Sequence, residues 1–253
     1  MKKAIIRTNK LCKSYILGKQ GLNVLKNIDL ELYEGDFTVI MGRSGSGKST
    51  LLYSISTMDQ PTSGSVQLLD KEITSLSEKE VTDIRKKEVS FIFQSINLLP
   101  DLTAFENIAY SGYGSGMGSK QEINRRTEEL LKQFDLLDIR DKYPSEISGG
   151  QQQRIAVARG LITGAKLLFG DEPTGALNSS AGKQVLDTLT EVNQKGQTII
   201  MVTHDLKAAR RASRLMYLSD GRIDGDLHLG AYSDNDKESR DALIYNFLKE
   251  RGW

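Results

Sequence analysis

Residues 42–50 read GRSGSGKST, a stretch that matches the pattern Gly-x-x-x-x-Gly-Lys-[Ser/Thr]. The preceding run, Phe37–Met41, is apolar and rich in β-branched residues, which predicts a buried strand, and residues 51–56 suit a helix. A strand, a glycine-rich loop and a helix in this order form the loop that encloses phosphate groups in nucleotide-binding proteins. The sequence therefore predicts an α/β fold with a nucleotide at the end of this strand.

The loop has the residue types that a triphosphate requires. Gly42, Gly45 and Gly47 allow backbone angles that turn successive N–H groups toward anionic oxygens. A helix N-terminus alone contributes only about 0.3–1 kcal/mol toward an anion, so further charge is needed. Lys48 is expected to contact the β- and γ-phosphates, and the Ser49 hydroxyl to bind Mg²⁺ between them. The alternative is an accidental match, with a chance on the order of 1% in a chain of this length.

The composition limits the classes of partner and compartment. Basic and acidic residues are balanced, 34 against 33, so bulk charge gives no support for a nucleic-acid partner. The single cysteine, Cys12, cannot form an internal disulfide and is expected to serve in packing. No apolar run reaches the roughly 18–20 residues that span a bilayer, and the basic start lacks a hydrophobic stretch of signal-peptide length. We therefore expect a soluble, cytoplasmic chain.

Apolar runs along the chain predict a mixed fold. Residues 4–8 and 24–32 predict two antiparallel strands around a glycine-containing turn. Four later runs predict the parallel strands of an α/β sheet: Phe37–Met41, 89–93, 166–170 and Thr198–Val202. Between residues 94 and 164 the strand pattern is replaced by amphipathic segments, 121–134 and 150–161, which predict a helical insertion.

Two further segments are assigned from composition. The stretch 111–119 has four glycines in nine residues and predicts a flexible surface loop. Near the C-terminus, the polar stretch 232–239 precedes a predicted short helix over residues 240–251, whose role the sequence leaves open.

Two adjacent carboxylates follow another predicted strand. Asp171 and Glu172 follow the hydrophobic run 167–170, and a charge is costly to bury there unless a partner pairs with it. Asp171 is expected to reach Mg²⁺ directly or through water, and Glu172, which points the other way, to accept a proton from the attacking water. The alternative is an ordinary Asp-Glu pair at the start of a turn or helix.

The stretch Ser148-Gly149-Gly150-Gln151 precedes a predicted helix and forms a second candidate anion site, with Ser148 as cap and phosphate donor. In order with the phosphate loop, the Asp-Glu pair and His204, it makes the chain resemble the nucleotide-binding subunit of ATP-binding-cassette (ABC) transporters. The resemblance covers roughly residues 4–225 and includes YPSEISGGQQQRIAVARGL, GDEPTGALN and IIMVTHD. It implies a P-loop NTPase (RecA-like) core with an N-terminal antiparallel β subdomain, an inserted α-helical subdomain over about residues 95–163, and a C-terminal tail over residues 226–253.

The resemblance implies ATP and Mg²⁺ as ligands, residue by residue. Tyr15 is expected to stack on adenine, with a buried strand tyrosine as the alternative. Gln94 is expected to sense the γ-phosphate through Mg²⁺ and water and to touch the membrane partner, and His204 to hydrogen-bond the γ-phosphate; an exposed loop glutamine and an ordinary polar histidine are the alternatives. The implied ATP contacts are Tyr15, Gly42, Arg43, Ser44, Gly45, Ser46, Gly47, Lys48, Ser49, Thr50, Ser148, Gly149, Gly150 and Gln151. The implied catalytic residues are Glu172, His204, Gln94 and Lys48, and the implied Mg²⁺ ligands are Ser49, Gln94 and Asp171.

The chain departs from the family pattern at two positions. Ile147 stands where the signature usually opens with Leu, an apolar exchange of little consequence. Asn178 stands where the family usually has Asp, which keeps the size and a carbonyl acceptor but removes the charge. Because the family's Asp helps to couple two nucleotide sites across a dimer, our hypothesis is weaker coupling with hydrolysis retained.

The resemblance also implies partners and a location. It implies a head-to-tail homodimer, in which residues 148–151 of one chain close on the ATP held by Lys48 of the other. An integral-membrane permease is the expected partner, at the cytoplasmic face of the cell membrane, and no nucleic acid is expected. The run FIFQSINLLPDLTAFENI, residues 91–108, resembles the subgroup that serves macrolide-efflux, lipoprotein-release and antimicrobial-peptide-resistance (bacitracin-type) permeases. The expected function is therefore ATP hydrolysis that drives export of, or resistance to, peptides, macrolides or lipophilic compounds.

Two alternatives to a transporter subunit stay open at this point. One is an ABC-type ATPase that drives a membrane partner for cell-division signalling, which would look almost identical in sequence. The other is a soluble ABC ATPase that acts without a permease, in translation or chromosome maintenance. Such ATPases usually carry two cassettes or a long coiled coil between the phosphate loop and the signature. Here Lys48 and Ser148 are 100 residues apart with no heptad run between them, which favours the transporter subunit.

Overall fold

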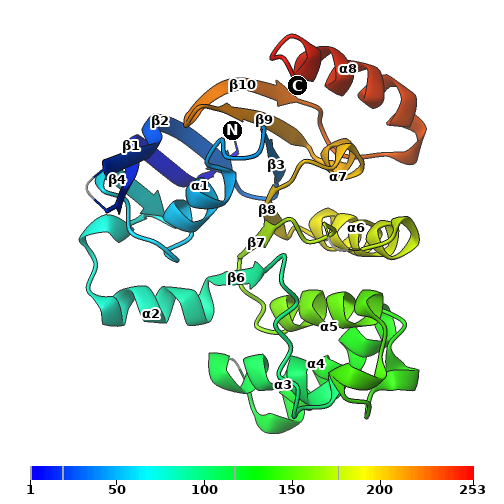
Figure 1. Cartoon of the computed structure of the whole chain (residues 1–253). Coiled ribbons are helices and arrows are strands. Elements are labelled where there is room, and N and C mark those ends of the chain that lie inside the picture. Colours follow the sequence, from blue (N-terminus) through cyan, green and yellow to red (C-terminus); the bar gives the residue numbers. More distant parts are fainter. Residues whose placement is uncertain (1, 19, 117, 176) are drawn as a thin grey trace. The chain divides into compact units, whose positions relative to one another are not determined.

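The computed structural model describes residues 2–18, 20–116, 118–175 and 177–253 (Figure 1). The chain divides into two compact units. The first unit combines Met1–Val81 with Val192–Trp253, and the second is Thr82–Glu191. Within the described residues, no helix combines the length and the apolar character that crossing a membrane requires.

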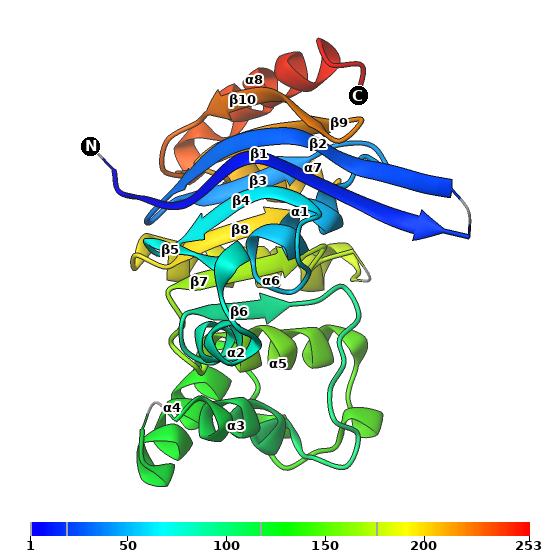
Figure 2. The same cartoon turned by 90° about the vertical axis from the view of Figure 1, so that its left-hand side faces the viewer.

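An antiparallel sheet forms one part of the first unit. Strands β1 (Ala4–Leu17) and β2 (Gln20–Tyr33) run side by side as a long hairpin (Figure 2), and β4 (Ser63–Leu68) and β5 (Lys71–Glu72) complete the order β2-β1-β4-β5. The predicted antiparallel pair is confirmed, but both strands are longer than predicted. The burial of β2 alternates only toward its C-terminal end, while its first four residues are exposed on both faces. A strand end that is exposed on both faces has no apolar alternation by which a sequence could reveal it.

Parallel strands form the other part of the first unit. Strand β3 (Phe37–Met41) lies between β8 (Thr198–Val202) and β9 (Arg214–Ser219), both parallel to it, and β10 (Arg222–His228) pairs antiparallel with β9. All residues of β3 and β8 are buried, as expected for central parallel strands. The predicted bounds of both strands are confirmed. Three helices belong to this unit: α1 (Lys48–Ile55), α7 (Leu206–Arg211) and α8 (Lys237–Lys249).

The second unit is mainly helical. Helix α2 (Glu78–Lys87) leads into it, and β6 (Val89–Ile92) pairs in parallel with β7 (Leu167–Asp171). Its remaining helices are α3 (Ala104–Ser115), α4 (Lys120–Gln133), α5 (Gly149–Leu161) and α6 (Ser179–Gln194), the last of which ends in the first unit. The two predicted amphipathic helices are confirmed as α4 and α5. Both helices begin with a capping box, from Ser119 and Ser148.

The predicted flexible loop over residues 111–119 is wrong for its first half. Helix α3 continues through Ser115 and ends at Gly116, which adopts φ +68°. Gly112 is buried in α3, and a Cβ there would lie 2.8 Å from Ile123 and 3.0 Å from Ile162. This glycine therefore permits close packing of the helix, which composition alone does not distinguish from loop flexibility. Met117, in the same stretch, lies outside the described residues.

The predicted C-terminal helix is confirmed as α8, which begins three residues earlier than expected. Its residue Arg240 is only 3% exposed and donates to a cluster of backbone carbonyls. The accepting residues are Arg210, Ala212, Leu229, Gly230 and Ala231. Asp241 adds a bidentate ion pair with Arg210 of α7. The tail is thus fastened to the first unit by a buried arginine that satisfies carbonyls of a loop.

We predict that Arg240→Met lowers the free energy of unfolding by about 1–3 kcal/mol, because several buried carbonyls lose their donor. Urea-induced unfolding followed by circular dichroism measures the change. Lys249→Met, an exposed change on the same helix, is the matched control and should stay within about 0.5 kcal/mol of the parent. Equal stability of the two variants would contradict the role given to Arg240.

Candidate nucleotide site

The phosphate loop connects β3 to the N-terminus of α1. Gly47 occupies the N-cap position with φ +101°, and among the described residues no side chain caps this helix. Gly42 has no room for a side chain, because a Cβ there would lie 2.2 Å from the Leu218 carbonyl oxygen and 2.7 Å from Ser46 Oγ. The start of α1 is therefore a helix N-terminus of the kind that can bind an anion.

Two polar groups of the loop, those of Lys48 and Ser46, are buried. Lys48 is 9% exposed, and its ammonium group donates to the carbonyls of Gly42, at 2.9 Å, and Arg43, at 3.0 Å. The hydroxyl of Ser46 is buried, and it has no hydrogen-bond partner among the described residues. A cation folded onto the loop's own carbonyls and a buried hydroxyl without a partner fit a loop that takes a phosphate group.

The C-terminal end of the chain reaches this loop. The Arg43 guanidinium donates to the backbone carbonyl of Gly252, three residues past the end of α8. Arg251 stacks on Phe247 at 4.0 Å and donates to the Asp224 carbonyl on β10. The sequence analysis missed this contact, since no local pattern joins residues 209 positions apart.

The predicted adenine-stacking residue, Tyr15, lies near the end of β1 and is 36% exposed. Its hydroxyl donates to Asp59 at 2.8 Å, and the Lys13 ammonium lies 5.0 Å from its ring centre. Burial, together with the bond to Asp59, raises the pKa of Tyr15, while a bond with Thr50 of α1 lowers it in part. The Tyr15 side chain is thus partly accessible to solvent, beside α1, the helix that follows the phosphate loop.

His204 belongs to the same edge of the first unit as the phosphate loop. Ile40 of β3 pairs with Val202 of β8, and the Thr203 N–H donates to the Ile40 carbonyl at 3.2 Å. The residues that follow these two strands therefore emerge side by side. His204 is exposed, and the next residue, Asp205, caps α7 through the Lys207 N–H.

The second unit brings together the other predicted groups at its own strand ends. Ile92 of β6 pairs with Gly170 of β7. Gln94, which is exposed, lies two residues beyond Ile92, and Asp171, which is 6% exposed, ends β7. The predicted strand 89–93 is one residue too long, because β6 ends at Ile92.

Glu172 has a backbone that is uncommon for its residue type. Its φ is +46°, in the left-handed region that favours glycine. The Gly175 N–H donates to the Glu172 carbonyl at 3.0 Å, which closes a turn directly after β7. Strain of this kind costs on the order of 1–3 kcal/mol and persists where the surroundings hold a group in place.

The signature stretch forms the start of α5. The Ser148 hydroxyl accepts from the Gln151 N–H at 3.3 Å, while Gln151 Oε1 accepts from the Ser148 N–H at 2.9 Å. A Cβ at Gly150 would lie 2.9 Å from the Cβ of Ala181, so the first turns of α5 and α6 approach closely. Asn178 caps α6 through the Ala181 N–H at 2.9 Å. Because Asp would cap a helix equally well, capping does not explain the exchange of Asp for Asn at this position.

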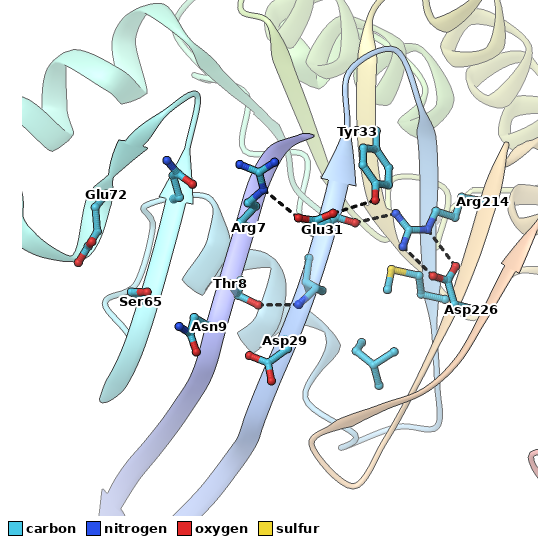
Figure 3. A pocket seen from close by; sticks show the side chains of 14 residues that line it. Arg7, Thr8, Asn9, Asp29, Glu31, Tyr33, Ser65, Glu72, Arg214 and Asp226 are labelled. Carbon is cyan, nitrogen blue, oxygen red and sulfur yellow. Dashed lines mark hydrogen bonds and ion pairs between the residues drawn. The ribbon is translucent and has the colours of Figure 1, made fainter. Parts of the chain in front are cut away.

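A pocket of about 790 Å³ also opens on the first unit, but it does not suit a polyphosphate (Figure 3). Glu31 accepts a hydrogen bond from Arg7 at 2.8 Å and one from Tyr33 at 2.9 Å. Both bonds lower the pKa of Glu31, and the bond from Tyr33 has the larger effect. Arg214 pairs with Asp226 through two bonds of 2.9 and 2.6 Å. The carboxylates in the lining are Asp29, Glu31, Glu72 and Asp226. They outnumber the two guanidinium groups, so the pocket repels anions.

Comparisons with known proteins agree with these features. The "ABC transporter" family profile matches residues 25–175. The macrolide export ATP-binding/permease protein MacB of Mannheimia succiniciproducens is 43% identical over 222 residues, which are 88% of this chain and 34% of that protein. The uncharacterized ABC transporter ATP-binding protein YknY of Bacillus subtilis is 40% identical over 219 residues, 87% of this chain and 95% of that protein. The chain thus spans about a third of MacB and nearly all of YknY.

The structural likeness is equally extensive. The ATP-binding cassette MJ0796, in a dimeric post-hydrolysis state with ADP and phosphate, has a TM-score of 0.83 and 37% identity, and the match covers 90% of this chain and all of that one. This likeness confirms the predicted fold class, an α/β P-loop NTPase core with an antiparallel β subdomain and a helical subdomain. The chain belongs to the ABC transporter family, as an ATP-binding cassette.

Proposed function

We propose that this cassette binds ATP with Mg²⁺ at the phosphate loop, hydrolyses it, and drives a separate membrane permease. The observation that carries the proposal is the loop itself. The backbone at Gly42 leaves no space for a side chain. The Ser46 hydroxyl is buried and has no hydrogen-bond partner among the described residues. The Lys48 ammonium donates to the neutral carbonyls of Gly42 and Arg43. Phosphate oxygens are stronger acceptors than these carbonyls, so Lys48 would exchange one for the other.

The remaining site residues have distinct proposed roles. Residues 42–50 surround the phosphates, and Tyr15 stacks on adenine. Ser49, Gln94 and Asp171 hold Mg²⁺, which supplies charge neutralisation between the phosphates. Glu172 accepts the proton of the attacking water, and His204 hydrogen-bonds the γ-phosphate. The left-handed backbone of Glu172 supports its role, because a strained residue is retained where its position matters.

The proposed assembly is a head-to-tail homodimer. Ser148, Gly149, Gly150 and Gln151 of one chain close on the ATP bound by the other. The capped start of α5 supports this role, because Ser148 and Gln151 satisfy each other and hold the glycine backbone in a defined conformation. The likeness to dimeric MJ0796 structures also supports the dimer. Hydrolysis would remove the bridging γ-phosphate and allow the dimer to open.

The proposed partner is an integral-membrane permease, and the proposed location is the cytoplasmic face of the cell membrane. MacB relatives carry "permease" in their names and are about three times as long as the matching region, whereas YknY matches over 95% of its length. The names of the MacB relatives support a permease as the partner. The likeness to macrolide export proteins supports an export or resistance function, of which the substrate is determined by the permease.

We predict that Glu172→Gln slows ATP hydrolysis by about 10²–10⁴-fold, because the amide cannot accept the proton of the attacking water. The substitution keeps the side-chain size, so the backbone strain at this position is unchanged. Phosphate release measures the rate, and size-exclusion chromatography should show an ATP-dependent dimer. Glu129→Gln, an exposed change on α4, is the control. Full turnover by Glu172→Gln would remove Glu172 as the base.

We predict that nucleotide binding changes the fluorescence of Trp253. This residue is the only tryptophan of the chain, is 43% exposed, and follows the Gly252 carbonyl that accepts from Arg43 of the phosphate loop. Titration with ADP or ATP should change its emission, and adenosine, which has no phosphate, should not. Lys48→Ala should shift the response to higher nucleotide concentration. If the Trp253 emission stayed constant while a labelled nucleotide saturated the site, the proposed link between the nucleotide and the C-terminal end through Arg43 and Gly252 would be contradicted.

We predict that the tagged Glu172→Gln variant, solubilised from membranes with ATP present, co-purifies with a polytopic membrane protein. Trapping the closed dimer should slow dissociation of the complex. Mass spectrometry identifies the partner, and a transport assay with that partner distinguishes export from signalling. Recovery of ribosomes or DNA in place of a membrane protein would defeat the transporter function.

A further inference from the structure

Gln94 lies in a loop whose shape is set by other elements of the second unit. The loop leaves β6 after Ile92 and ends where α3 begins, at Ala104. The Gln94 side chain is exposed, and it extends from a segment outside any helix or strand. Its position therefore depends on contacts made by the loop backbone on either side of it.

One arginine of α5 holds this backbone on the downstream side. Arg159 donates from Nη1 to the Asn97 carbonyl at 2.6 Å and from Nη2 to the Ile96 carbonyl at 3.0 Å. The guanidinium thus binds two successive carbonyls, a planar fork that a lysine cannot reproduce. Arg159 is partly buried, and this burial lowers its pKa. Hydrogen bonds from a partly desolvated cation are stronger than neutral ones in water.

The next residue of α5 holds the upstream side. The Ser90 hydroxyl of β6 donates to the Gly160 carbonyl. A Cβ at Gly160 would lie 3.4 Å from the Ile92 side chain, so helix and strand are in close contact here. Two adjacent residues of α5 therefore fix the backbone before and after Gln94. The rigid element between them is one helix, which begins with the signature stretch at Gly149.

A second clamp fixes the far end of the loop. Asn107 of α3 is 1% exposed; its side chain accepts from the Leu99 N–H at 2.8 Å and donates to the carbonyls of Leu99, Leu102 and Thr103. At the first clamp, Asn97 adopts φ +48°, which asparagine tolerates better than most residues. The loop backbone is thus held at residues 96–97 and at residues 99–103, and the bonds of Arg159 are the nearer of the two to Gln94 in sequence.

We propose that Arg159 is a positioning residue for Gln94, and that it makes Gln94 follow the movements of the signature helix α5. The inference rests on the proposed role of Gln94 at the Mg²⁺ ion. When Ser148–Gln151 at one end of α5 engage a nucleotide, the same helix carries the loop backbone at Ile96 and Asn97 with it. The loop transmits this displacement to Gln94, three residues before Asn97.

The test compares two arginines of the same helix. Arg159→Met removes the fork and keeps the apolar stem, and Arg159→Lys keeps the charge with a single ammonium. Arg154→Met is the matched control, because Arg154 also donates to a backbone carbonyl, that of Phe134 at 2.7 Å, but within the described part of the chain it makes no bond to the Gln94 loop. For each full-length variant, kcat and the Mg²⁺ concentration for half-maximal hydrolysis are measured, with urea unfolding as the stability readout.

We expect Arg159→Met to lower kcat about 10- to 100-fold and to raise the Mg²⁺ requirement, since partners that orient a metal ligand have effects of this size. Arg159→Lys should be intermediate, and it carries the test if the methionine variant does not fold. Arg154→Met should lose stability without a change in the Mg²⁺ requirement. Equal Mg²⁺ dependence in the Arg154 and Arg159 variants would overturn the proposal.

A double-mutant cycle with Gln94→Ala decides whether Arg159 acts through Gln94. If it does, adding Arg159→Met to Gln94→Ala should lower kcat no further. Additive losses would overturn the positioning role and leave the proposed function intact. Wild-type hydrolysis and Mg²⁺ dependence in Gln94→Ala alone would remove the role of Gln94 in the proposed function, and the role of Arg159 with it.

Discussion

Backbone carbonyls in loops have no helix or sheet partner, and each one that is shielded from water must find a donor elsewhere. In this chain arginine is the recurrent donor. Arg240 donates to carbonyls of the segment that leads into α8, and Arg159 donates to carbonyls of the loop after Gln94. A guanidinium has five N–H groups in a fixed plane, so one side chain can hold a whole turn of irregular backbone. The irregular segments that carry the site residues can therefore be as well defined as the helices beside them.

The same requirement explains the state of the phosphate loop. A loop that turns its N–H groups inward turns some carbonyls outward, and those of Gly42 and Arg43 accept from the Lys48 ammonium. Lys48 is thereby held within the loop by bonds to two neutral carbonyl oxygens. A phosphate group offers a charge-assisted bond of roughly twice the strength. Replacement of the two carbonyls by phosphate oxygens would therefore be favourable, which supports the proposed binding of a polyanion.

The sequence predicts those parts of the structure that have a local cause. The strands Phe37–Met41 and Thr198–Val202 are buried apolar runs. The loop after the first of them matches the phosphate-loop pattern, which few other structures need. The pairs formed at strand ends, such as the phosphate loop with His204 and Gln94 with Asp171, follow from parallel pairing. By contrast, Gly112 looks like a loop residue, and only the contact with Ile123 reveals it as a packing position. The bond from Arg159 to Asn97 joins residues 62 positions apart, and no local sequence pattern around either residue predicts it.

Positive φ angles occur close to Gln94 and at Glu172, two residues of the proposed mechanism. Asn97, near Gln94, and Glu172 both have positive φ, but the cost differs, because asparagine adopts the left-handed region readily and glutamate does not. At Asn97 the conformation is held by Arg159, which donates to the carbonyls of Asn97 and Ile96. At Glu172 a backbone bond from the Gly175 N–H closes the turn. A glycine at position 172 would remove the strain but also the carboxylate. Glu172 therefore combines a costly backbone with the carboxylate that the proposed mechanism uses as its base.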